Sequence, residues 1–302
     1  MATDAMGADA NEPIDAERAV ELLREATGDR YVLVRRLTGG ETGAHEVRCV
    51  PRDERFVLKW ETRAEAAELR REGVVLANLL RTRAVWPVPR QRALQADGCL
   101  LVLQEFMTGD AATVLTPSIV DDLLRLHDAR LGLGGGRSSG PWAERLIETL
   151  ARGGHGYCDH ASLRRYDART SELVREVEAF ASTVVPAELE GEDLVHWDLH
   201  PGNLLIAGDT VSAVIDTDFC AVGDAAFDLV MLAVASAAYG CSPDVRRRLR
   251  EAALDPLPAI RRKAYLGHLF VRFLDWPIRR GADSEVEFWL SEVERCRAEG
   301  YF

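Results

Sequence analysis

The segment of residues 194–219, LVHWDLHPGNLLIAGDTVSAVIDTDF, places oxygen-bearing side chains at the edges of short apolar runs. The runs NLLIA and TVSAVID are typical of two strands, and the Gly-Asp pair between them favours a tight β-hairpin. A hairpin reverses the chain, so it brings Asp216 back toward the loop that holds Asp198 and Asn203. The sequence therefore predicts that three oxygen-bearing side chains converge at one point of the fold.

Converging carboxylate and amide oxygens suit Mg²⁺, which takes a few hard ligands together with water and substrate phosphates. Asp198 need not be a ligand, because a carboxylate in this place can instead accept the proton of a hydroxyl that attacks phosphorus. The alternative is a structural loop that binds nothing. The residue types thus indicate a magnesium site with phosphoryl-transfer chemistry beside it.

Two motifs in this region resemble a known family. HWDLHPGN is similar to the H-x-D-x-x-x-x-N catalytic loop of the kinase-like phosphotransferases, and VIDTDFCAVGDAAFDL is similar to the metal-binding segment of the aminoglycoside phosphotransferase family. Protein kinases usually have Asp-Phe-Gly at the second motif, whereas this chain has Asp-Thr-Asp at 216–218. The resemblance implies an α+β, bilobal protein-kinase-like fold, with a small β-rich N-terminal lobe and a larger, mainly helical C-terminal lobe.

The resemblance also implies roles for individual residues. Asp198 is the catalytic residue that orients and deprotonates the acceptor hydroxyl, and Asn203 and Asp216 hold Mg²⁺. His196 braces the loop by hydrogen bonding, and Asp228 ties the segment behind the metal site.

Other polar and aromatic residues are candidates for the acceptor side. Trp197 stands where many family members have glycine, so its ring either lines the acceptor pocket or simply packs. Asp218 either supports the metal ligands or contacts the acceptor, and the role of His200 stays open. Asp275 and Glu287, in the acidic C-terminal helices, are candidates for binding a cationic acceptor, although such residues are more often solvated.

The N-terminal lobe carries further matches to the family. RFVLKW supplies Lys59 for the nucleotide phosphates, and RREGVVLANL selects Glu72 as its partner over two other helix glutamates. A glycine-rich turn would cover the phosphates with backbone N–H groups. The turn contributes Gly39, Gly40 and Gly43, and the stretch between the lobes contributes backbone groups of Gln104, Glu105, Phe106 and Met107 to the purine.

Hydrophobic periodicity divides the chain into three parts. Residues 1–13 lack the pattern of a signal peptide and predict a disordered tail. Residues 14–105 predict the nucleotide-binding lobe, which begins with a helix at 14–26. Residues 106–302 predict the catalytic and acceptor-binding lobe, where helical patterns dominate. The glycine-rich stretch 131–140 has no strand leading into it and is interpreted as a connection.

Composition excludes several classes of protein. The formal net charge of −12 argues against a nucleic-acid binder. The sequence has no run of about 18 apolar residues, so it predicts no membrane-spanning helix. Six scattered cysteines are typical of reduced thiols in a cytoplasmic protein. His155, Cys158, Asp159 and His160 are possible transition-metal ligands, but their spacing is irregular and favours a plain loop. We expect a monomer or weak dimer.

Together these observations predict an enzyme that transfers the γ-phosphoryl group of ATP or GTP to a hydroxyl of a small molecule. The acidic composition, and an Ala- and Arg-rich usage that resembles proteins of antibiotic-producing actinomycetes, favour a cationic antibiotic as acceptor. Aminoglycosides and tuberactinomycin-type basic cyclic peptides are the candidates, and resistance would be the result. The alternatives are a metabolic kinase for a choline- or homoserine-like acceptor, and a catalytically silent nucleotide-binding module.

Overall fold

The computed structural model describes residues 14–37, 43–154 and 158–302, which form two compact units. Of the described residues, those up to Asn78 and Pro89–Met107 form the first unit, and Leu79–Val88 and those from Thr108 onward form the second. The predicted tail, residues 1–13, lies outside the described residues. The predicted boundary had placed residues 79–88 in the first unit. They belong to the second because Trp86 donates its Nε1 hydrogen to the carbonyl oxygen of Leu126 at 2.6 Å and lies under the guanidinium of Arg130.

The first unit is built on an antiparallel sheet of five strands in the order β1-β2-β3-β5-β4. Its strands are β1 (Tyr31–Arg36), β2 (His45–Cys49), β3 (Glu54–Glu61), β4 (Gln91–Ala96) and β5 (Cys99–Glu105). Its helices are α1 (Ala16–Thr27) and α2 (Ala64–Arg83), the second of which runs on into the other unit. The predicted helix at 14–26 is confirmed as α1.

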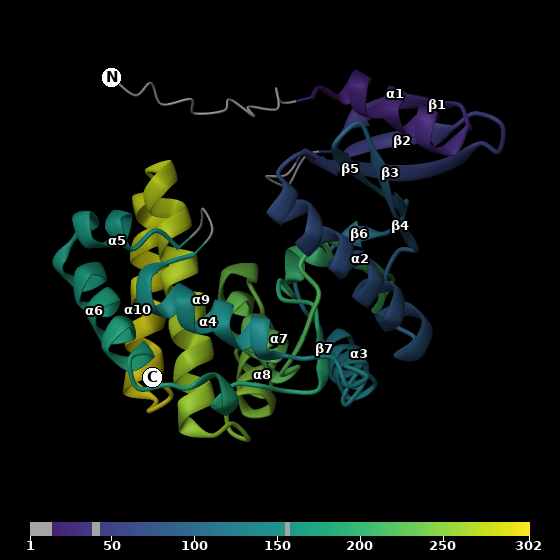
Figure 1. Cartoon of the computed structure of the whole chain (residues 1–302). Coiled ribbons are helices and arrows are strands. Elements are labelled where there is room, and N and C mark those ends of the chain that lie inside the picture. Colours follow the sequence, from purple (N-terminus) through teal and green to yellow (C-terminus); the bar gives the residue numbers. More distant parts are fainter. Residues whose placement is uncertain (1–13, 38–42, 155–157) are drawn as a thin grey trace, which may run out of the picture. The chain divides into compact units, whose positions relative to one another are not determined.

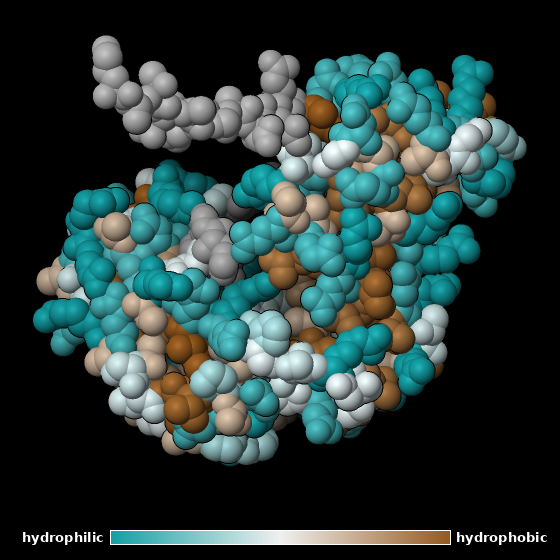
Figure 2. All heavy atoms as spheres, viewed as in Figure 1, coloured by the Kyte–Doolittle hydropathy of each residue, from teal (hydrophilic) through white to brown (hydrophobic). Residues whose placement is uncertain are grey.

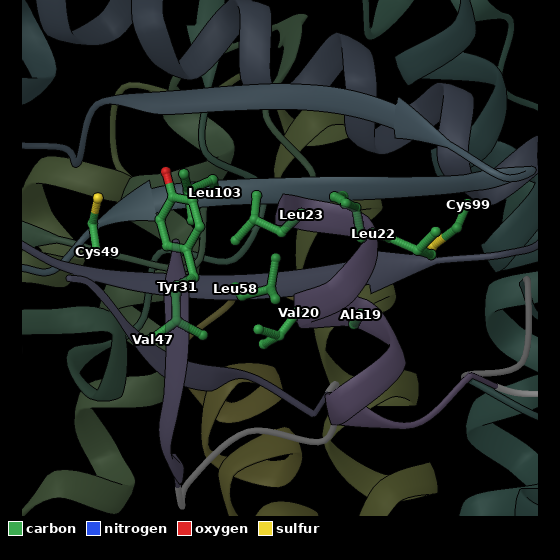
Figure 3. Packing of buried hydrophobic residues seen from close by; sticks show 11 residues of the cluster. Ala19, Val20, Leu22, Leu23, Tyr31, Val47, Cys49, Leu58, Cys99 and Leu103 are labelled. Atoms are coloured by element: carbon green, nitrogen blue, oxygen red, sulfur yellow. The ribbon is translucent and has the colours of Figure 1, made fainter. Parts of the chain in front are cut away.

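Each helix covers one face of this sheet, and the alternation of side chains along β5 follows from that. Leu101 and Leu103 join the cluster formed with Val20 and Leu23 of α1, which Figure 3 shows facing the strands. Leu100, on the opposite face, packs with Val74 of α2. Because successive residues of a strand point to opposite faces, β5 is buried along nearly its whole length.

The second unit is mainly helical, as predicted (Figure 1). Its α-helices are α3 (Pro117–Asp128), α4 (Gly140–Arg152), α5 (His160–Tyr166), α6 (Ala168–Ala181), α7 (Ala226–Ala235), α8 (Pro243–Ala253), α9 (Ala259–Arg280) and α10 (Asp283–Ala298). Its short strands are β6 (Asp110–Ala111), β7 (Asp193–Val195), β8 (Leu204–Ala207), β9 (Thr210–Val214) and β10 (Ala221–Gly223). The long helix α9 packs against α4, α5, α6 and α10, and α4 also packs against α6 (Figure 1).

The surface of the protein is largely hydrophilic on the face seen in Figure 2, with hydrophobic side chains between the polar ones. Within residues 14–37, 43–154 and 158–302, no helix is long and apolar enough to cross a membrane.

Candidate active site

The hairpin predicted from the sequence is present as β8 and β9, with Gly208 at positive φ in the two-residue turn. Leu204 pairs with Val214, and the N–H of Ile215 donates to the carbonyl oxygen of Asn203 at 2.9 Å. This bond holds the end of β9 against the start of β8. Asp216, the next residue, therefore emerges beside the loop, as the sequence predicted.

Asn203 is fixed by its side-chain amide. Its Nδ2 donates to the main-chain oxygen of Asp198 at 2.9 Å and lies 3.4 Å from a carboxylate oxygen of that residue. Because the amide nitrogen is committed to the loop, the amide oxygen of Asn203 remains as an acceptor. This oxygen and the carboxylate of Asp216 form a hard donor set that fits Mg²⁺. The ligand roles themselves stay predictions.

The carboxylate of Asp198 is held by a residue that the sequence reasoning missed. Oδ1 accepts a hydrogen bond from Nη2 of Arg272 in α9 at 2.8 Å, and the Asp198 side chain is 16% exposed. Burial alone would raise the pKa of Asp198, but the pKa is lowered overall, and the positive charge of Arg272 is the largest of the effects that lower it. Asp198 is therefore ionised, as a hydroxyl-orienting carboxylate must be.

Two residues anchor the loop that carries Asp198, in the roles that the sequence predicted for them. His196 is fully buried, and its Nε2 lies 2.9 Å from the carbonyl oxygen of Ile215. The carboxylate of Asp228 accepts the backbone N–H groups of His196 at 2.7 Å and Trp197 at 2.9 Å. Asp228 also forms a fully buried ion pair with Arg130 of the connection after α3. The loop is thus tied to α7.

Trp197 packs rather than lining a pocket, which decides between the two alternatives left by the sequence. Its side chain is 3% exposed and contacts the rings of Trp142, Phe227 and His268. Its backbone has a positive φ of 75°, a conformation that costs a residue with a Cβ atom. The hydrogen bond to Asp228 and the aromatic packing hold it there, so the predicted acceptor contact is corrected.

The acidic acceptor candidates are already paired within the protein. Asp275 is 1% exposed, and it accepts from Ser162 at 2.5 Å and pairs with Arg279 at 2.9 Å. Glu287 is exposed but accepts two hydrogen bonds from Arg169, at 2.9 and 2.5 Å. Each carboxylate is thus paired with an arginine of the same unit, which weakens the case for an acceptor contact, and the burial of Asp275 weakens it further.

Of two further polar residues near the loop, one is buried and one is partly exposed. Asp218 is 2% exposed, which favours support of the segment over contact with an acceptor. His200 lies 3.8 Å from a carboxylate oxygen of Asp198, and its Nδ1 accepts the N–H of Gly202 at 3.1 Å and lies 3.2 Å from the hydroxyl of Tyr239. Burial lowers the pKa of His200, and Arg272 adds to this effect against the pull of Asp198. His200 therefore shapes the loop as a neutral group.

In the first unit, the predicted nucleotide residues lie on β3 and α2. Lys59 is a buried residue of β3, paired with Val102 of β5. Glu72 is exposed on α2, so its pairing with Lys59 stays a prediction. Gly43 precedes β2, and its carbonyl oxygen lies 3.2 Å from Nδ1 of His45. Gly39 and Gly40 lie outside the described residues.

The predicted purine-binding stretch is partly used by the sheet itself. Gln104 lies between β3 and β4, and its side chain donates to that of Gln91 at 3.1 Å. The N–H groups of Glu105 and Phe106 donate to main-chain oxygens at 2.9 and 3.2 Å. These two donors are therefore unavailable to a purine. The purine-binding role of this stretch stays a prediction.

The histidine and cysteine cluster at 155–160 forms no metal site in the described residues, of which His155 is not one. Cys158 and His160 are buried, and His160 lies 2.8 Å from a carboxylate oxygen of Glu178. Asp159 caps α5 through the N–H of Ala161. Asp159 and His160 thus have structural contacts with α5 and α6.

Comparison with solved structures supports the predicted α+β, protein-kinase-like fold. A thermostable mutant of the aminoglycoside phosphotransferase APH(4)-Ia is similar over 93% of this chain and 99% of that one, with a TM-score of 0.64 and 15% identity. The macrolide 2'-phosphotransferase MphH from Brachybacterium faecium has a TM-score of 0.54 at 17% identity, over 92% of this chain and 97% of that one. At these identities the likeness establishes the fold alone.

Comparison of sequences identifies the family. A curated homoserine kinase from Methylocella silvestris is 29% identical over 125 residues, which cover 33% of this chain and 39% of that enzyme. The match thus spans well under half the length of that relative. The model of the phosphotransferase enzyme family matches residues 34–264, which is more than half of the chain and includes both polar motifs. The protein therefore belongs to the phosphotransferase enzyme family.

Proposed function

We propose that this phosphotransferase transfers the γ-phosphoryl group of ATP or GTP to a hydroxyl of a small molecule, with antibiotics as the first acceptor candidates. One observation carries the proposal. The ionised carboxylate of Asp198 sits in a loop that hydrogen bonds fix beside Asn203 and the end of β9. An oriented proton acceptor next to a pair of hard oxygen donors is the arrangement that phosphoryl transfer requires.

The chain's own residues would divide the reaction between them. Asp198 orients the acceptor hydroxyl and receives its proton as the new P–O bond forms and the bond to the leaving nucleoside diphosphate breaks. Lys59 offsets phosphate charge. Asn203 and Asp216 would hold Mg²⁺, which when bound neutralises charge on the β- and γ-phosphates. Positioning and electrostatics thus supply most of the rate.

Two lines of evidence bear on the acceptor. The similar solved structures include a macrolide phosphotransferase and a gentamicin complex of the phosphotransferase APH(2")-IIa, the latter with a TM-score of 0.57 at 16% identity over 93% of this chain and 96% of that one. They favour an antibiotic acceptor and resistance as the biological outcome. The likeness to a homoserine kinase favours the second candidate, a metabolic acceptor with an amino group.

The acceptor is tested by measuring release of nucleoside diphosphate from ATP and from GTP, with Mg²⁺, over a panel of small molecules. The panel holds hygromycin B, gentamicin, a macrolide, a basic cyclic peptide, choline and homoserine, and each is run with wild type and with Asp198→Asn. We expect turnover with an antibiotic that is lost in the variant. Turnover with choline or homoserine alone would identify the enzyme as a metabolic kinase. Nucleotide binding without any turnover would favour the silent module.

The metal role of Asp216 gives a second test. Asp216→Asn removes a charged oxygen donor, so the Mg²⁺ concentration for half-maximal turnover should rise at least about tenfold, a scale typical of damage to a metal site. Titration of turnover with Mg²⁺ measures this effect. Asp209→Asn is the matched control, because Asp209 lies in the turn of the same hairpin and accepts from Thr116. An unchanged requirement in Asp216→Asn would remove that residue from the metal site.

The remaining properties follow from composition. All six cysteines are free and buried, which supports a reducing compartment and a cytoplasmic location. The acidic net charge disfavours a nucleic-acid partner. We infer that the partners are a nucleoside triphosphate and one small acceptor, with the protein acting as a monomer or weak dimer.

A further inference from the structure

An arginine from α9 contacts the carboxylate on which the proposed reaction depends. Nη2 of Arg272 lies 2.8 Å from Oδ1 of Asp198, and the two side chains are 25% and 16% exposed. The position is unusual for a cation, because the neighbouring Val271 and Leu274 are fully buried. A cation kept in an apolar stretch of helix calls for an explanation beyond solubility.

Stability does not explain the pair well. Removing two charges from water costs free energy, and replacing a buried ion pair by apolar groups is often neutral or stabilising. Arginine has instead a planar guanidinium group, which fixes the orientation of a carboxylate and stabilises its negative charge. The geometry therefore points to orientation of Asp198 as the purpose of the contact.

The two oxygens of Asp198 are unequally engaged. Oδ1 accepts from Arg272 at an ordinary hydrogen-bond length, whereas Oδ2 has a contact of 3.4 Å with Nδ2 of Asn203 and one of 3.8 Å with Nε2 of His200. Contacts beyond about 3.2 Å are weak hydrogen bonds at best. Oδ2 is thus the oxygen with capacity left for another donor.

We propose that Arg272 is a positioning residue, which holds Oδ1 of Asp198 so that Oδ2 is presented to the acceptor hydroxyl. This inference rests on the proposed function, because it takes Asp198 as the proton acceptor. It adds a residue of the C-terminal helices to the reaction, outside the two polar motifs. Arg272 touches neither the acceptor nor the nucleotide in this role and acts only through Asp198.

The test measures the turnover of Arg272→Ala and Arg272→Lys in two ways. One uses the acceptor that the panel identifies, and the other follows ATP hydrolysis, in which water is the acceptor. Loss of orientation should lower kcat of Arg272→Ala by about 100-fold, since misplacement of a reacting group by about 1 Å has that effect. The KM for ATP should not change. Added guanidinium should restore part of the turnover of Arg272→Ala. Arg272→Lys should keep part of the wild-type turnover, because lysine retains the positive charge.

A double-mutant cycle separates positioning from a general structural role. In an Asp198→Asn background, Arg272→Ala should cause little further loss of kcat, because the group that it positions is already gone. Thermal unfolding of wild type, Asp198→Ala, Arg272→Ala and their double variant should show coupling between the two side chains, because alanine at 198 removes the oxygen that accepts from Arg272. Lys263→Ala is the matched control, since Lys263 lies on the same helix and pairs with Glu176 at the same 2.8 Å. That variant should keep wild-type kcat.

Several outcomes would overturn the inference. Wild-type kcat in Arg272→Ala, higher kcat in that variant, or losses that simply add with Asp198→Asn would each exclude positioning. Absence of coupling in thermal unfolding would exclude the contact itself, whether or not turnover is detected. Failure of the proposed function is distinguishable, because it would appear in the acceptor panel, either as wild-type turnover in Asp198→Asn or as nucleotide binding without any turnover of wild type.

Discussion

Asp198→Asn is expected to lower kcat by about 10²- to 10⁴-fold, the range that a positioned proton acceptor contributes, while ATP binding persists. Asparagine keeps the shape of the side chain, and its amide oxygen can still accept from Arg272 at the position of Oδ1. The loop should therefore stay folded through His196 and Asp228. The variant loses only the negative charge and the ability to take up a proton.

This prediction is measured as kcat with the acceptor from the panel, beside nucleotide binding followed by the rise in melting temperature with Mg²⁺ and ATP. Asp255→Asn is a suitable control, because Asp255 is an exposed carboxylate that accepts from the hydroxyl of Tyr301 at 2.9 Å. Its kcat should stay within about twofold of wild type, as surface substitutions usually have small effects. A fully active Asp198→Asn would refute the assignment of Asp198.

The sequence predicted the part of the site that residues close together in the chain form, which is the β8–β9 hairpin with Asn203 and Asp216 at its ends. The two apolar runs and the Gly208–Asp209 turn specify β8 and β9, and the turn sets their pairing, with one irregularity between Leu205 and Ile206. Once the register is fixed, Asp216 must emerge next to Asn203. The anchoring roles of His196 and Asp228 came from the family resemblance, and the hydrogen bonds of these residues agree with it.

Tertiary packing decides the features that the sequence could not provide. Arg272 follows Asp198 by 74 positions, and only the packing of α9 brings the two together. The one available signal was a single arginine within the apolar run LFVRFL. The pairing of Glu287 could not be predicted from the sequence, because its partner, Arg169, lies 118 positions away and no periodicity connects them.

Asp228→Ala is expected to cost more stability than any other substitution discussed, about 3–5 kcal/mol of the free energy of unfolding, the usual loss when one partner of a buried ion pair is removed. Neither Asp228 nor Arg130 is exposed to solvent. The substitution leaves the charge of Arg130 buried and unpaired, and it removes the acceptor for the N–H groups of His196 and Trp197. Urea unfolding of wild type and variant measures the loss.

A second substitution distinguishes the contribution of the charge from that of the backbone hydrogen bonds. Arg130→Met removes the buried cation, so Arg130→Met combined with Asp228→Ala should be more stable than Asp228→Ala alone. The recovery should be partial, because the two N–H groups of the loop still lack their acceptor. Glu176→Ala, which breaks partly exposed ion pairs with Lys263 and Arg297, should cost about 1 kcal/mol or less. Equal losses in Glu176→Ala and Asp228→Ala would mean that the buried pair does not anchor the loop that carries Asp198.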